Sequence, residues 1–482
     1  MVVALDIPSL KSVAEDEELI VYQQRWVILA VFSALNLSNA LMWVTYAPIS
    51  DLSETYFHAS TTEINLLAVV FLIFYPVGMV LEVTIMKKNG LRVTLLLGSL
   101  LTALGTLLRY IPAQASSPPR TCYGVTLVGQ VLGSLAQPLL VNMPAHISAA
   151  WFSQKERELS TTIASLFSPI GNAVGTIFPV LFVSQTPDGA VVGMETLCLV
   201  EWLICTACLG VAYALVDDAP PSPPSRSAAG LSSAFSSASA AGLSSAFSSA
   251  AASSLFSDCQ TLFLNRDYLI LFVSFSLGLA IFNSVLTLAN QLVRPFGYTN
   301  DDASNCSIAF IACGLFGAGI SSVILERTRC YAEVVKGGFF LCFCFIVLLV
   351  CMLRPDNGAG LVFAFAITGF ALLPMLPSSF ELAAEIVYPL PLDLAVGLLV
   401  CGGNVLGIPI TFGLQALIAL PAWGPPPFSP ANLFAVAVVA LASGLLLLLF
   451  KGEYRRMKLD RQAREDPSTS VCNELDSPLL QA

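Results

Sequence analysis

Long runs of apolar residues alternate with short polar segments along most of the chain. Twelve runs are long enough, at about 20 residues, to cross the hydrocarbon core of a bilayer as helices. They cover residues 26–49, 64–86, 91–112, 123–150, 158–183, 192–216, 267–292, 304–326, 335–353, 358–388, 393–420 and 430–450. Strands of a membrane barrel would be shorter and would alternate in polarity. The pattern predicts an all-α membrane protein with 12 transmembrane helices.

The polar interval between the sixth and seventh runs is much longer than the others. It opens with a Pro/Ser-rich stretch and contains AAGLSSAFSSA twice, at 228–238 and 240–250. Sequence this rich in Ser, Ala and Gly buries too little apolar surface to fold alone. An alternative is an amphipathic surface helix built on the Leu and Phe residues of the repeat. We expect five parts: a cytosolic segment (1–25), a six-helix half (26–216), a disordered cytosolic linker (217–266), a second six-helix half (267–450) and a cytosolic tail (451–482).

Six spans, a linker and six more spans resemble the plan of the major facilitator superfamily. In that fold, an axis along the membrane normal relates the two halves. Two similar short segments, which we call the echo, agree with the duplication of a six-helix unit. The sequence Gly-Asn-Ala-Val-Gly at 171–175 lies in the fifth span, and Gly-Asn-Val-Leu-Gly at 403–407 lies in the eleventh, each followed closely by proline.

Composition excludes several other classes of protein. Hydrophobic residues make up 56% and charged residues 11%, where about 25% charged is usual for soluble proteins. The net charge of −10 offers no basic stripe for a nucleic acid. Most of the 13 cysteines lie inside apolar runs, and there are only two histidines. We therefore expect no metal, no cofactor and no enzymatic activity.

The distribution of Lys and Arg predicts the orientation in the membrane. With a cytosolic N-terminus, 18 of the 22 Lys and Arg fall on the cytosolic side. The outer set is Arg109, Arg120, Arg294 and Arg354. Both termini are then cytosolic. We expect the plasma membrane, with an endolysosomal membrane as the alternative, because residues 15–20 (Glu-Asp-Glu-Glu-Leu-Ile) fit an acidic dileucine sorting pattern.

Polar side chains inside predicted spans are candidates for a solute pathway, because burying them in lipid is costly. In the first span, Asn36, Asn39, Trp43 and Tyr46 are separated by 3, 4 and 3 residues, which places them on one helical face. The alternative is that such groups hydrogen-bond neighbouring helices without touching a solute. Further candidates are Gln137 in the fourth span, Asn283 and Gln291 in the seventh, and Asn404 in the eleventh.

A pocket of amides, hydroxyls and one tryptophan has no fixed positive charge. It suits a neutral or cationic solute, and tryptophan is the best aromatic partner for a quaternary ammonium. Among carboxylates in the spans, Glu381 in the tenth is our candidate for a proton-carrying or gating group. Glu195 and Glu201 in the sixth span receive no role.

Several stretches resemble the feline leukaemia virus subgroup C receptor-related family, solute carrier family 49. They are Asn-Ala-Leu-Met-Trp at 39–43, Gly-Leu-Arg at 90–92, Ala-Gln-Pro at 136–138, Asn-Gln at 290–291 and Phe-Glu at 380–381. The likeness runs from about residue 25 to 451, and is strongest to the poorly characterised major-facilitator-domain branch.

The resemblance implies transport of small organic solutes such as choline and ethanolamine, with haem and pyridoxine-type vitamins also associated with the family. It implies a site at Trp43 and Gln137. The family's tyrosine in the seventh span falls on Asn283, and its glutamine in the eleventh falls on Asn404.

The sequence thus predicts a monomeric transporter in the lipid bilayer that carries a choline- or ethanolamine-like solute by alternating access. A haem, porphyrin or vitamin carrier is one alternative. A receptor or sensor that does not transport is the other.

Overall fold

The computed structural model describes residues 22–114, 117–153, 156–222, 259–328, 330–387, 392–420 and 429–452. The acidic segment at 15–20, the tandem repeat and most of the predicted C-terminal tail lie outside this part of the chain. Twelve helical segments within it are long and apolar enough to span a membrane. The predicted helical membrane architecture is therefore confirmed.

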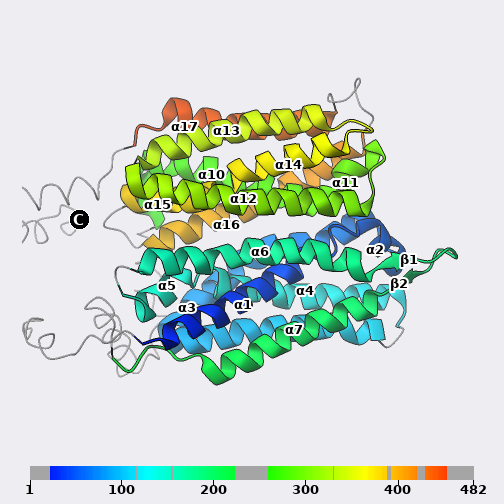
Figure 1. Cartoon of the computed structure of the whole chain (residues 1–482), viewed down its shortest axis with the longest axis horizontal. Helices are drawn as coiled ribbons and strands as arrows, with labels where there is room; N and C mark the ends of the chain where they lie inside the picture. Colours follow the sequence, from blue (N-terminus) through cyan, green and yellow to red (C-terminus); the bar gives the residue numbers. More distant parts are fainter. Residues whose placement is uncertain are drawn as a thin grey trace, which may run out of the picture. The chain divides into compact units, whose positions relative to one another are not determined.

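The chain divides into two compact units, residues 1–247 and 248–482. In each unit the long helices run side by side (Figure 1). The first contains α1 (Gln24–Val44), α2 (Ser50–Phe57), α3 (Thr61–Gln114), α4 (Pro119–Val141), α5 (Pro144–Trp151), α6 (Arg157–Phe182), strands β1 (Ser184–Gln185) and β2 (Val191–Val192), and α7 (Met194–Leu215). The second contains α10 (Arg266–Thr287), α11 (Ala289–Val293), the 3-10 turn η1 (Arg294–Phe296), α12 (Asn300–Thr328), α13 (Tyr331–Met352), α14 (Gly358–Leu372), α15 (Met375–Val387), α16 (Leu392–Ile418) and α17 (Pro430–Leu449).

The long helix α3 contains the second and third predicted spans, which meet at Gly90. This residue has φ +80° and ψ −173°, so the helical path is broken there. Glycine is favoured at positive φ because it has no Cβ. A Cβ at this position would also lie 2.7 Å from Oδ1 of Asp218. Asp218 accepts a hydrogen bond from the backbone N of Arg92, which holds the start of the third span.

Several predicted spans end or break at prolines. The first run was expected to continue to residue 49, but α1 ends at Val44. Pro48 lacks the N–H that would bond to the carbonyl of Val44, and the N–H of Ala47 takes that acceptor at 3.1 Å. Pro144 begins α5, and Pro374 lies in the break between α14 and α15.

Two ordered features were not predicted. The connection between α6 and α7 forms an antiparallel hairpin, in which Ser184 pairs with Val192 and Gln185 with Val191. Residues 259–264, at the end of the predicted disordered linker, are helical. At the linker's start, Asp217 forms an ion pair with Arg92 at 3.2 Å.

The two units repeat one packing relationship. In the first, α1 packs against α6, and in the second, α10 packs against α16. The echoed glycines lie at these contacts. A Cβ on Gly171 would lie 2.4 Å from the carbonyl oxygen of Leu37, and a Cβ on Gly403 would lie 2.5 Å from the side chain of Leu279. The echo therefore marks where the fifth helix of each half approaches the first.

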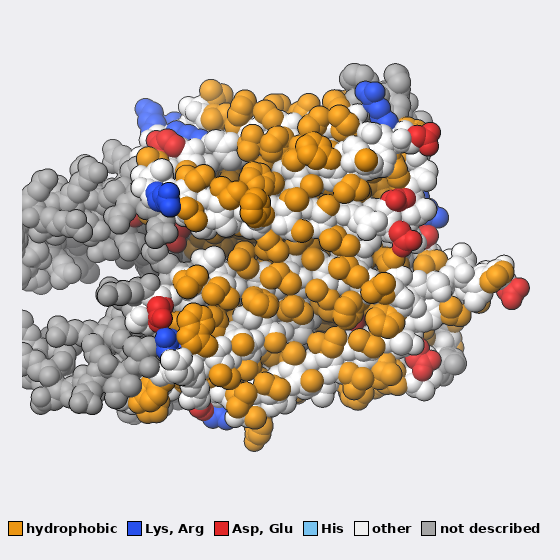
Figure 2. Space-filling model, viewed as in Figure 1, with side chains coloured by type: hydrophobic (Ala, Val, Ile, Leu, Met, Phe, Trp, Pro, Cys, Tyr) orange, Lys and Arg blue, Asp and Glu red, His pale blue; other side chains and the backbone are white. Residues whose placement is uncertain are grey.

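The surface is that of a membrane protein. Figure 2 shows hydrophobic side chains over the middle of the helices and charged side chains gathered near the helix ends. Large apolar residues with more than half of their surface exposed include Val77, Val80, Leu181, Phe316, Phe363 and Leu448. Such a band is unfavourable in water and favourable in hydrocarbon.

Candidate functional site

The polar face of α1 is bonded to neighbouring helices of its own half. The amide of Asn36 donates to the carbonyl of Ala164 in α6 at 3.4 Å. The amide of Asn39 donates to Oγ1 of Thr102 at 3.1 Å and to the carbonyl of Gly133 at 3.0 Å. Asn39 thus joins α1 to α3 and α4, which is the interhelical role that the sequence left open as the alternative.

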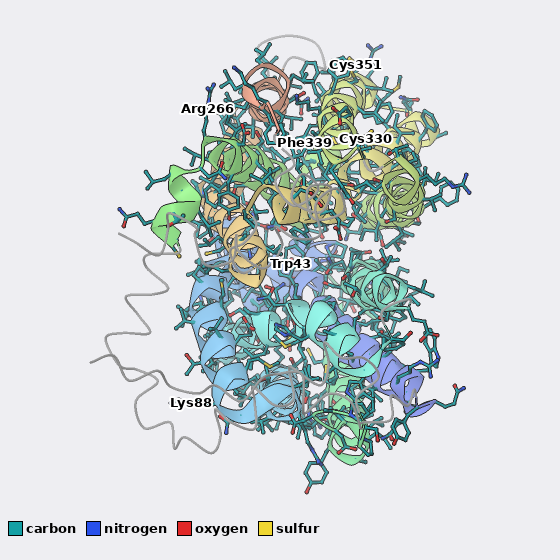
Figure 3. All side chains as sticks on the ribbon, turned by 90° about the vertical axis from the view of Figure 1, so that its left-hand side faces the viewer. Trp43, Lys88, Arg266, Cys330, Phe339 and Cys351 are labelled. Carbon is teal, nitrogen blue, oxygen red and sulfur yellow. The ribbon has the colours of Figure 1, made fainter. Side chains whose placement is uncertain are left out.

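Trp43, which Figure 3 labels, lies in α1, and only 5% of its surface is exposed. Its indole N–H donates to the carbonyl of Ala68 in α3 at 3.2 Å. The one polar group of the indole is therefore satisfied within the half. A further ligand of Trp43 would have to contact the face or edge of the ring. Contact between Trp43 and a solute stays a prediction.

A fully buried ion pair lies beside this face. Arg109 was counted among the basic residues of the outer side of the membrane; it lies inside α3 and is 1% exposed. Its guanidinium lies 2.8 Å from a carboxylate oxygen of Glu201 in α7, and neither side chain has exposed surface. Because Arg109 lies inside a span and not in a connection, it does not bear on the orientation, which stays a prediction. An Arg and a Glu in two predicted spans, each too costly to bury alone, were the signal that should have paired them.

The ion pair contacts the end of α1 directly. Nε of Arg109 donates to the hydroxyl of Tyr46 at 3.1 Å, and the guanidinium lies 4.8 Å from the centre of the Tyr46 ring. Another guanidinium nitrogen donates to the carbonyl of Met42 at 3.4 Å. The hydroxyl of Thr45 donates to Oε1 of Glu201 at 2.7 Å. The predicted site residue Tyr46 is therefore bonded to a charged group that the sequence analysis did not assign to the site.

Helix α4 supplies two glutamines with different surroundings. Gln137, the predicted site residue, is partly buried. Gln130 is fully buried, and neither its amide nitrogen nor its amide oxygen has a hydrogen-bond partner among the described residues. Such an amide is costly in an apolar interior. Gln130 was not among the site residues chosen from the sequence.

In the second half, two predicted residues meet. The amide of Asn283 in α10 donates to Oδ1 of Asn404 in α16 at 3.1 Å, and both are buried. The hydroxyl of Ser284, the next residue in α10, lies 2.8 Å from the hydroxyl of Thr411, which is about two turns beyond Asn404 in α16. Gln291 lies in the short helix α11, beyond the break at Leu288, and is partly buried. The structure thus brings together Asn283 and Asn404 and places Gln291 on a separate helix.

The two carboxylates of α15 differ in burial. Glu381, the candidate chosen from the sequence, is exposed, whereas Glu385, one turn further on, is 7% exposed. Both make polar interactions within the protein. A gating or proton-carrying role for Glu381 stays a prediction.

Buried positive charge in the described part of the chain is neutralised locally. The buried basic side chains there are Arg25 and Arg109. Arg25 pairs with Glu156 at 3.2 Å, and Arg109 pairs with Glu201. Within these same residues, no group of three or more His, Cys, Asp or Glu side chains is placed to hold a metal ion.

Comparisons with known proteins agree with this architecture. Residues 28–389 match the family model described as Major Facilitator Superfamily. Solute carrier family 49 member A3 of Danio rerio is 28% identical, over 93% of this chain and 91% of the relative. Choline/ethanolamine transporter FLVCR2 of Rattus norvegicus is 28% identical, over 94% of this chain and 79% of the relative. The crystal structure of a D-xylose-proton symporter aligns with a TM-score of 0.66 at 13% identity, covering 89% of this chain and 99% of the symporter. These matches confirm the resemblance to solute carrier family 49, and the symporter supports the fold alone.

Proposed function

The chain belongs to the Major Facilitator Superfamily of membrane transporters, and we propose that it moves a small cationic or neutral organic solute of the choline and ethanolamine class by alternating access. The observation that carries this proposal is the local neutralisation of buried positive charge. Arg109 is neutralised by Glu201 inside the helical bundle. A pathway without an unpaired cation does not repel a quaternary or primary ammonium, and it offers no fixed charge to bind an anion.

Trp43 is the proposed recognition element for the ammonium group. Because its N–H is bonded to Ala68, the indole can offer a ligand only the π face of its ring. That face carries the negative end of the ring quadrupole and attracts cations. The name of the rat relative, a choline/ethanolamine transporter, supports this solute class.

In the second half, an amide stands where the resemblance implies a second aromatic ring for the solute. Asn283 occupies the position of the tyrosine that the resemblance implies, and it is bonded to Asn404. Both amides retain donor and acceptor capacity beyond this single bond. We propose that this amide pair is the polar solute-binding element of the second half.

Uptake of radiolabelled choline and ethanolamine by proteoliposomes containing the full chain tests the proposal. We compare Trp43→Phe, which keeps an aromatic face, with Trp43→Leu, which removes it. Trp26→Leu, at the other end of α1, is the control, because Trp26 is 36% exposed and packs on Phe152. We expect Trp43→Leu to lose at least about tenfold in uptake, Trp43→Phe to keep part of it, and the control to resemble wild type.

An uncharged analogue makes the test specific to charge. In 3,3-dimethyl-1-butanol, carbon replaces the quaternary nitrogen of choline at nearly the same shape. We expect it to compete with choline much more weakly than unlabelled choline does. Equal competition, or wild-type uptake no higher than in empty liposomes, would refute the amine proposal.

We propose the plasma membrane as the site of action. The sorting pattern at residues 15–20 motivates the endolysosomal alternative. Imaging of fluorescently tagged wild type and Leu19→Ala decides between them. Surface signal for both proteins supports the plasma membrane, whereas intracellular wild type with surface Leu19→Ala supports endolysosomal sorting.

A further inference from the structure

We propose that Arg109 and Glu201 are positioning residues that hold the end of α1 and thereby set the affinity of the Trp43 region for solute. Neither residue needs to touch the solute for this role. The transport readout of this inference rests on the proposed function, but its structural readout does not.

The guanidinium of Arg109 makes three polar contacts. It donates to the carbonyl of Met42 and to the hydroxyl of Tyr46, and it pairs with Glu201 at 2.8 Å. Met42 directly precedes Trp43, and Tyr46 follows it by three residues. One rigid, planar group therefore holds α1 on both sides of the tryptophan.

Glu201 holds the same end from a different helix. One carboxylate oxygen accepts from the hydroxyl of Thr45 at 2.7 Å, and the other faces Arg109. Because α1 ends at Val44, its last carbonyl groups have no partner from a continuing helix. The ion pair supplies one of these partners, at Met42, and bonds the two side chains that follow the helix end. The end of α1 is thus held from α3 by Arg109 and from α7 by Glu201.

Charged groups are an expensive means of attachment in this setting. Apolar side chains of similar volume often serve stability as well as a buried ion pair does. What they cannot supply is a set of directed hydrogen bonds to a carbonyl and to two hydroxyls. The geometry therefore fits a positioning role better than a purely stabilising one.

In the second half, the corresponding helix end is attached by uncharged groups. Its first helix, α10, ends at Thr287, and the hydrogen bonds near that end join uncharged groups. Two of them join α10 to α16, from Asn283 to Asn404 and between Ser284 and Thr411. Among the described residues, the charged attachment belongs to the half that carries Trp43.

The decisive variant is Arg109→Lys. Lysine keeps the positive charge beside Glu201, but its single ammonium cannot reproduce the planar fork that reaches Met42 and Tyr46 together. Arg120→Lys is the matched control, since Arg120 pairs with Glu63 at 2.6 Å and is 62% exposed. We expect Arg109→Lys to raise the KM for choline about tenfold with a smaller change in kcat. We expect Arg120→Lys to change neither constant.

A double-mutant cycle tests whether Arg109 acts through Tyr46. Tyr46→Phe keeps the ring and removes the hydroxyl that accepts from Arg109. If Arg109 acts through this contact, Arg109→Lys with Tyr46→Phe raises KM little more than the larger single change does. Independent, multiplicative increases in KM would contradict the positioning role. Tyr46→Phe also keeps the test valid if Arg109→Lys fails to fold.

A spectroscopic readout is independent of any solute. Protein labelled with 5-fluorotryptophan gives fluorine NMR signals that Trp43→Phe and Trp26→Phe assign. We expect Arg109→Lys to shift or broaden the Trp43 signal and to leave the Trp26 signal unchanged. An unchanged Trp43 signal overturns the inference whatever the solute is. If wild type transports no choline but the Trp43 signal moves as expected, the proposed function fails and the positioning role stands.

Discussion

The guanidinium of Arg109 and the carboxylate of Glu201 lie 2.8 Å apart, and both side chains are completely shielded. They come from α3 and α7, which are separated along the chain by α4, α5, α6 and a hairpin. Charges buried this deeply persist only as a pair, because each alone has lost its hydration without compensation.

Removing one partner of this pair should destabilise the protein more than removing both. We expect Arg109→Gln and Glu201→Gln each to lower the free energy of unfolding by about 3–5 kcal/mol, since an uncompensated charge remains buried. Arg109→Met with Glu201→Leu should cost clearly less. Thermal unfolding in detergent measures the order of the variants.

The exposed pair of Arg120 and Glu63 is the control for this prediction. Its side chains are 62% and 34% exposed, so Arg120→Gln should change the free energy of unfolding by about 1 kcal/mol or less. If the buried single variants unfold no earlier than Arg120→Gln, the ion pair does not have the energetic role assigned to it.

The contact between α6 and α1 predicts that Gly171 tolerates no side chain. A Cβ there would lie 2.4 Å from the carbonyl oxygen of Leu37 and 2.8 Å from the Cβ of Ala40, so the helices would have to separate. We expect Gly171→Ala to lower the free energy of unfolding by about 1–3 kcal/mol, despite the better helix propensity of alanine.

Gly210 provides the matched comparison. It lies in α7, and a Cβ built there meets no atom within 4 Å. Gly210→Ala should be neutral or stabilising by up to about 1 kcal/mol. Equal melting temperatures for the two variants would contradict the close contact between α1 and α6.

The hydrogen bond between Asn283 and Asn404 predicts energetic coupling between α10 and α16. Because the amides are buried and 3.1 Å apart, replacing both by alanine should cost less than the sum of the single losses. We expect a coupling energy of about 1 kcal/mol from thermal unfolding of the four proteins. The same cycle between Asn283 and Thr328, which bonds to its own helix at Ile324, should show additivity. Additive losses for the two asparagines would contradict the contact.

The predicted orientation can be tested at the hairpin between β1 and β2. If both termini are cytosolic, the turn at residues 186–190 lies outside the cell. An epitope inserted beside the exposed Gly189 should then bind antibody on intact cells, whereas tags at either terminus should require permeabilisation. Terminal tags that stain on intact cells would contradict the predicted topology.

Whether a feature could be predicted from the sequence depends on how far apart along the chain the interacting residues lie. The twelve spans were predicted in the right places, with errors of a few residues at their ends, because a span must be long and apolar whatever it packs against. The seventh run illustrates the limit. Residues 267–292 read as one span, yet the helix ends at Thr287 and resumes at Ala289, without a proline to mark the break.

By itself, the sequence determined the class of protein, the twelve helices and the similar segments that contain Gly171 and Gly403. Each of these follows from local composition or from a repeated pattern along one chain. It also placed Asn39, Trp43 and Tyr46 on one helical face. Periodicity, however, does not show which neighbour a face meets.

Only the tertiary structure decided what those side chains bond. It joined Arg109 to Glu201 and Asn283 to Asn404, and it directed Asn39 and the indole N–H of Trp43 into contacts with neighbouring helices. The physical reason is that the value of a buried polar group depends on its partner. That partner lies on another helix, tens of residues away along the chain, and is brought near by packing alone.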